Sequence, residues 1–204
     1  MRTVVASVAA TVAVILLAGL AFLYSGVYHV GATDRHWDLT YWLLNTARVR
    51  SIKAHALGIL VPAELGDEAK IVMGTEHFAA HCAVCHGAPG VPKGDIAAGL
   101  YPQPPNLAYA AAQFSPAELF WILKNGIKMS GMPAWADHSD EELWGTVAFL
   151  EKLQSMSEQE YARLVMASMA QGGHHHPGGA EGDHRGPSLA PGQLAPPGST
   201  GRQR

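Results

Sequence analysis

The chain has 204 residues, of which 48% are hydrophobic and 15% are charged, and its formal net charge is −3. This balance argues against nucleic-acid binding, because no basic stripe is available to neutralise phosphates. Hydrophobic residues crowd the first thirty positions, whereas residues 171–204 are rich in Gly, Pro and His. One small globular domain must therefore lie between these two ends.

The first predicted element is an apolar helix. Residues Val4–Tyr24 carry no charge, and at about 1.5 Å per residue they match the roughly 30 Å hydrocarbon core of a bilayer. We expect residues 1–30 to be an N-terminal membrane anchor. A cleaved signal peptide is the alternative, because Arg2 precedes the run, but the apolar region of a signal peptide is shorter, about 7–15 residues.

Residues 31–63 predict an amphipathic juxtamembrane helix and a connector that Pro62 ends. Such a helix can lie along a bilayer surface, or it can pack on the domain or on another subunit. The pattern alone does not separate lipid from protein as the apolar partner. Four residues share one helical face and three cations follow: Trp37, Tyr41, Leu44 and Ala47, then Arg48, Arg50 and Lys53.

Residues 64–155 form the predicted domain, in which helices alternate with loops rich in Gly and Pro. A first helix begins near Asp67 and runs toward Cys82, and a long irregular stretch follows it. No stretch alternates apolar and polar residues as a half-buried strand would, so we predict an all-α fold. The helices are too few and the loops too long to bury a core alone, which implies that something large fills the middle.

Two later helices in this domain carry capping signals. A Ser followed three residues later by Glu predicts a capping box at each start, and Pro at the first helical position strengthens the earlier one. The last helix has apolar residues at core spacing. The residues concerned are Ser115, Pro116, Glu118 and the closing Gly126 for one helix, and Ser139, Glu142, Leu143, Val147 and Leu150 for the other.

The only two cysteines of the chain lie in the motif HCAVCHG. On a helix, Cys82, Cys85 and His86 project from the same face, so two thiols and an imidazole converge on one object. A haem fits this geometry, since the thiols can add to its two vinyl groups while the imidazole ligates the iron. Cys-x-x-Cys-His is also the attachment signature of c-type haem, and we predict one covalently bound haem c.

Two other chemistries are known for a pair of cysteines at this spacing. A redox-active disulfide of the thioredoxin type needs a preceding strand and a βαβ context, which the pattern lacks. A zinc site needs a fourth strong ligand at suitable spacing, and the chain has no second cysteine pair.

With this motif, residues 64–155 resemble a class I monohaem cytochrome c. The resemblance implies a small all-α domain built around one covalent haem. Gly74 and Phe78 sit where that family packs its first helix closely against its last, and Trp144 and Phe149 sit where the last helix meets it. As plain core residues these aromatics would serve equally well.

The segment KMSGMPAW offers two thioethers as the sixth iron ligand. In similar cytochromes the distal methionine is presented as Gly-Met-Pro, so the resemblance implies Met132. Met129, a histidine such as His138, or an open site are the alternatives. Thioether ligation raises the reduction potential and suits electron transfer.

The predicted domain is acidic. It carries eleven carboxylates against five lysines, a net charge of about −6 before the haem propionates. A redox partner with a basic surface would be steered toward it. Lys124 and Lys128 lie near the methionine segment and could form a local basic rim at the haem edge.

Beyond the domain, residues 156–170 predict a short helix capped by Ser157 with Glu160. Residues 171–204 lack the apolar content to fold, and we expect disorder. The run His174, His175 and His176 is a possible secondary metal site.

The sequence therefore predicts a single-pass protein of the bacterial inner membrane, with its haem domain on the periplasmic face. Its function would be to transfer single electrons between a membrane oxidoreductase and a terminal oxidase or reductase. No catalytic constellation is recognisable, so we expect an electron carrier and not an enzyme. The alternatives are an electron-accepting subunit of a larger oxidoreductase complex, and a haem protein that handles metal through its histidine-rich tail.

Overall fold

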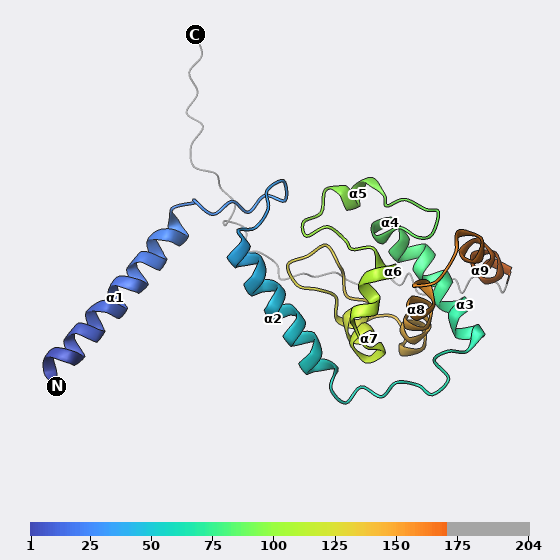
Figure 1. The fold of residues 1–204 in the computed structure, drawn as a ribbon, viewed down its shortest axis with the longest axis horizontal. Coiled ribbons are helices and arrows are strands. Elements are labelled where there is room, and N and C mark those ends of the chain that lie inside the picture. Colours follow the sequence, from blue (N-terminus) through green and yellow to red (C-terminus); the bar gives the residue numbers. More distant parts are fainter. Residues whose placement is uncertain (171–204) are drawn as a thin grey trace, which may run out of the picture. The chain divides into compact units, whose positions relative to one another are not determined.

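The computed structural model describes residues 1–170, which are helical and contain no strand, as the sequence predicts. A π-helical turn, Phe78–Cys82, joins α3 to α4, and a 3₁₀ turn, Ala111–Gln113, follows α6. The helices of Figure 1 are α1 (Arg2–Tyr24), α2 (Asp38–Ala56), α3 (Glu68–His77), α4 (Ala83–His86), α5 (Asp95–Ala98), α6 (Leu107–Ala110), α7 (Pro116–Asn125), α8 (Asp140–Leu153) and α9 (Glu158–Ala170).

Helix α1 is the one described helix that is long and apolar enough to cross a membrane by length and composition. It has 23 residues and none of them is buried. This is consistent with the predicted membrane anchor, although a signal sequence has the same character.

The core forms where α3 crosses α8. A Cβ added at Gly74 would lie 1.9 Å from the carbonyl oxygen of Gly145, so the two backbones are in direct contact. One turn along, the rings of Phe78 and Phe149 pack with centroids 4.7 Å apart, and both side chains are fully buried. The close packing of these helices that the resemblance implied is present.

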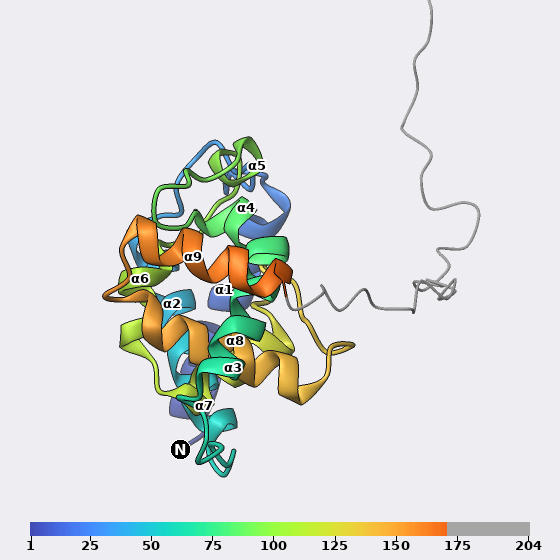
Figure 2. The same cartoon turned by 90° about the vertical axis from the view of Figure 1, so that its right-hand side faces the viewer.

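Trp144 is also in the core. Its ring stacks on Phe120 with centroids 4.3 Å apart, so it joins α8 to α7. Helix α9 lies beside α3 (Figure 2) and adds Tyr161 and Leu164 to the buried core. The predicted C-terminal helix is thus a packed part of the domain.

Both predicted capping boxes are present. At α7, Ser115 Oγ accepts a hydrogen bond from the Glu118 backbone at 3.3 Å, and the Ser115 backbone donates to the Glu118 carboxylate at 2.8 Å. At α8, Ser139 and Glu142 make the same pair of contacts, at 3.3 and 2.9 Å. These contacts fix where both helices begin, because they satisfy N–H groups that have no partner within the helix.

The second half of α2 packs on α7 (Figure 1), which confirms one of the two partners considered for this helix. Ile52 and Ala56 are buried in the contact, and the ring of His55 lies 5.5 Å from that of Trp121. The segment before α2 is held as well, because the His36 backbone donates to the hydroxyl of Tyr101 at 3.1 Å.

The close contact of α3 with α8 predicts how adding one methyl group at Gly74 changes stability. Gly74→Ala should lower the free energy of unfolding by about 1–3 kcal/mol, because backbone must move to admit the Cβ. Gly66→Ala is the matched control, since nothing lies within 4 Å of a Cβ there, and it should change stability by less than about 0.5 kcal/mol. Denaturant unfolding of the detergent-solubilised chain measures both, and equal midpoints for the two variants would contradict the crossing.

Candidate functional site

The cysteine motif lies at the end of a continuous helical segment. Cys82 is the last residue of the π-helical turn, while Cys85 and His86 belong to α4. Single π turns inside helices are frequent at functional sites. Gly87 ends α4 with a φ of 71°, a left-handed conformation that favours glycine, and the chain turns away there.

The two thiols are not joined to each other. Both cysteines are free, with Cys82 buried and Cys85 half-buried. Burial, with the adjacent Cys85, raises the pKa of Cys82 to about 12. A redox-active pair needs a thiolate that is stabilised near neutral pH, so this environment argues against a thioredoxin-like role.

His86 is oriented by a backbone carbonyl. Its Nδ1 lies 2.8 Å from the carbonyl oxygen of Pro105. A carbonyl can only accept, so Nδ1 carries the proton and Nε2 keeps its lone pair. Burial lowers the pKa of His86, an effect that the Pro105 contact opposes and nearby Lys93 reinforces. The ring is therefore neutral near pH 7, the state that can ligate a metal.

The carbonyl that orients His86 is itself held in place. Lys93 Nζ donates to the carbonyl of the preceding Pro104. On the other side, the Asn106 side chain accepts from the Ala108 backbone at 2.9 Å and so caps α6. Every residue has a backbone carbonyl, so the residue type at position 105 does not indicate this contact. The sequence therefore did not identify Pro105 as part of the site.

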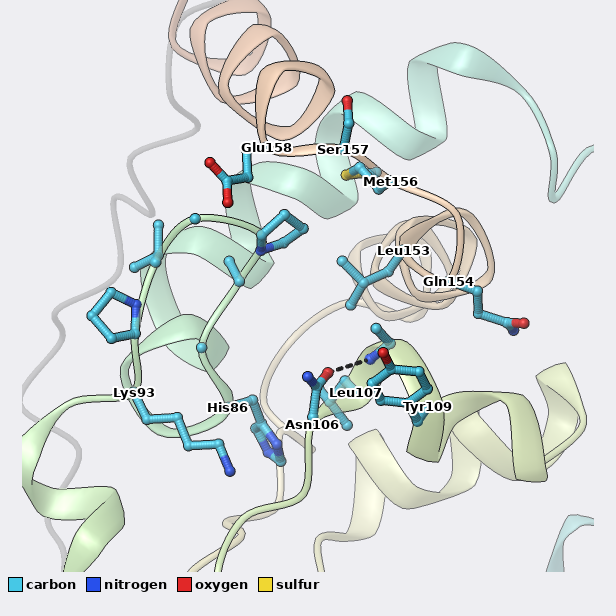
Figure 3. A pocket seen from close by; sticks show the side chains of 17 residues that line it. His86, Lys93, Asn106, Leu107, Tyr109, Leu153, Gln154, Met156, Ser157 and Glu158 are labelled. Carbon is cyan, nitrogen blue, oxygen red and sulfur yellow. Dashed lines mark hydrogen bonds between the residues drawn. The ribbon is translucent and has the colours of Figure 1, made fainter.

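A hollow of about 540 Å³ opens beside His86 (Figure 3). Its walls are the loop 87–93, the segment 106–109 and the junction of α8 with α9. Of the predicted site residues that the structure describes, His86 lines the hollow, whereas Cys82, Cys85 and Met132 do not.

The methionine segment forms a loop closed by hydrogen bonds. The Ile127 backbone donates to the carbonyl of Met132 at 3.2 Å, and Ser130 Oγ donates to the carbonyl of Ile127 at 2.7 Å. Met132 is half-buried and packs against the core cluster that includes Cys82. Met129, at a φ of 60°, is 80% exposed. The loop thus turns Met132 toward the core and leaves Met129 in solvent.

Three histidines link the cysteine helix to the end of this loop. The ring of His77 lies 4.8 Å from that of His81 and 4.7 Å from that of His138, and Trp135 packs against all three. Within residues 1–170, no group of three His, Cys, Asp or Glu side chains is arranged to hold a metal ion. The sequence did not predict this cluster, because His138 is far from the other two in the chain.

Two other sequence hypotheses concern charge and metal. Lys124 is paired with Asp140 at 2.6 Å, so a basic rim at this edge would depend on Lys128. The histidine run 174–176 lies outside the described residues.

Residues 69–150 match the family model described as "Cytochrome C oxidase, cbb3-type, subunit III". This region is therefore similar to a cytochrome c domain. Such a domain implies haem c binding, and the match places both cysteines, His86 and Met132 inside it.

One relative is the quinohemoprotein alcohol dehydrogenase of Comamonas testosteroni, 28% identical over 134 residues. The match covers 63% of this chain but 18% of the dehydrogenase. This chain thus spans less than a fifth of the length of that relative.

The segment beside His86 gives a prediction of its own. Asn106→Ala should lower the free energy of unfolding by about 1 kcal/mol, because it removes the cap that holds α6 and the neighbouring Pro105 carbonyl. Asn106→Ser should restore most of this loss, since serine is also a good N-cap. Chemical denaturation distinguishes the three proteins, and identical stability of the alanine variant and the wild type would show that the cap is not formed.

Proposed function

We propose that the protein is a membrane-anchored monohaem c-type cytochrome that transfers single electrons between redox partners. Cys82 and Cys85 would form the two thioethers, and His86 and Met132 would be the axial iron ligands. The contact between His86 Nδ1 and the Pro105 carbonyl carries this proposal, because it leaves a neutral Nε2 available at the motif that attaches haem c.

The remaining residues fit the same group. When bound, haem supplies an iron that alternates between ferric and ferrous states and so carries one electron. His86 is held in one tautomer by Pro105, and Met132 is held by the hydrogen bonds that close its loop. A thioether opposite a histidine raises the reduction potential, which suits a carrier in an oxidising respiratory segment.

Helix α1 and the charge of the domain support a location for the protein and a type of redox partner. Helix α1 would hold the protein in the bacterial inner membrane, with the cytochrome domain on the periplasmic face. There it would exchange electrons with a membrane oxidoreductase and a terminal oxidase or reductase. Because the domain is acidic, a partner with a basic docking surface would be attracted at low ionic strength.

Absorption spectra test the ligands directly. The wild type should be low-spin, with the weak sulfur-to-iron band when ferric and no response to carbon monoxide when ferrous. Met132→Ala should lose that band and bind carbon monoxide, because the sixth position opens. Met129→Ala is the matched control from the same loop and should retain the wild-type spectrum, since its side chain is exposed.

Three results would contradict this assignment. A carbon monoxide response in the wild type would mean that the sixth position is open and that ligand binding or catalysis should be considered. If Met129→Ala loses the sulfur-to-iron band and Met132→Ala keeps it, then Met129 and not Met132 is the sixth ligand. Release of haem into acidified acetone by the unmodified wild type would exclude thioether attachment.

A second candidate is an electron-accepting subunit of a larger oxidoreductase. The similarity to part of a dehydrogenase favours it, because the remaining 82% of that relative has no counterpart in the match. If so, the protein should co-purify with a second subunit from gently solubilised membranes. Isolation of the chain alone would exclude a stable complex.

A further inference from the structure

The first half of α2 carries a band of exposed apolar side chains, here called the collar. At about 100° of rotation per residue, the collar residues surround the helix axis and leave no gap wider than about 100°. Asp38 and Thr40 occupy the two widest gaps, but apolar side chains lie on opposite sides of the helix, so one flat protein surface cannot cover them all. The collar residues, each between 41% and 67% exposed, are Trp37, Leu39, Tyr41, Trp42, Leu43 and Leu44.

The cytochrome domain does not cover the collar. The buried residues of α2 are Ile52 and Ala56, which pack on α7 at the other end of the helix. The second half of α2 therefore packs on the domain, whereas the first half is left exposed by it.

The collar begins beside the end of α1. The ring of Trp37 lies 5.9 Å from Phe22, in the last turn of α1, and 5.2 Å from Tyr28. If α1 spans a bilayer, the collar lies at the depth where that helix leaves the hydrocarbon. Trp and Tyr are enriched at this depth, because their rings are apolar and their N–H and O–H groups are polar.

Charge around the collar matches a lipid surface. Arg48 lies about 6 Å beyond Leu44 along the helix, at 1.5 Å per residue, and the headgroup layer of a bilayer is only about 5–8 Å thick. With the collar among the headgroups, cations this close along the helix are within reach of lipid phosphates. In residues 35–56 the cations are Arg35, Arg48, Arg50 and Lys53, and the one acid is Asp38.

We infer that the collar is a lipid-binding element, which inserts among the headgroups and upper acyl chains of an anionic bilayer. The inference rests on the proposed anchoring by α1. A protein partner bound to one side would leave the opposite apolar side chains in water, whereas lipid can surround the helix. Through Ile52 and Ala56, the same helix then links the lipid surface to the cytochrome domain.

The test uses the full haem-loaded chain in vesicles of phosphatidylcholine and phosphatidylglycerol. An environment-sensitive nitrobenzoxadiazole label is placed at Leu43→Cys in the collar or, as the matched control, at Ser51→Cys, an exposed position later in α2. The wild type treated with label is the blank. Quenching is measured with doxyl-labelled lipid from the membrane side and with iodide from the aqueous side, and flotation measures anchoring.

The expected result is that the label at Leu43→Cys is quenched several-fold more by doxyl lipid than the label at Ser51→Cys, and several-fold less by iodide. If the chain floats with the vesicles but iodide reaches both labels equally, the collar inference is wrong while anchoring by α1 stands. Shielding at Leu43→Cys from both quenchers would mean that protein covers the collar, which also overturns the inference. A chain that does not float would overturn the anchor and the collar together.

Discussion

The backbones of α3 and α8 touch where Gly74 lies against Gly145, and the rest of the domain is arranged around this contact. Glycine has no Cβ, so a pair of glycines at the crossing lets the two helix backbones approach this closely. The segment that carries Cys82 and His86 extends from one end of α3, and the segment that carries Met132 leads into α8. The crossing therefore fixes the relation between the two stretches that carry the predicted ligands.

Irregular segments complete the site, and a few contacts hold them. His86 and Lys93 both bind carbonyls of the Pro104–Pro105 segment. On the other side, a Cβ at Gly131 would lie 2.7 Å from the Leu100 side chain, so the methionine loop contacts the loop that leads to these prolines. The cysteine helix, the proline segment and the methionine loop are thus connected by direct contacts.

Local chemistry made part of this structure predictable. The capping boxes at Ser115 and Ser139 depend on residues near one another in sequence, and they are present. The close approach at Gly74 was implied by the family resemblance, and it is present too. Contacts between distant segments were not predictable. Trp144 could pack on any apolar surface that the fold offered, and the surface it met was Phe120. The partner of His86 is a backbone carbonyl, and the residue type does not indicate which carbonyl will lie beside the ring.

The same reasoning connects the membrane with the predicted iron ligand. Helix α2 packs on α7 through Ile52, and α7 ends at Gly126, where a Cβ would lie 2.6 Å from the backbone of Pro133. The loop that presents Met132 is thus in contact with the helix that α2 supports. Because packed helices move as rigid units, a bilayer that fixes α2 also fixes the orientation of this loop. An electron carrier attached in this way would present one constant face to membrane partners, and its exchange rate with them would depend on their position more than on diffusion.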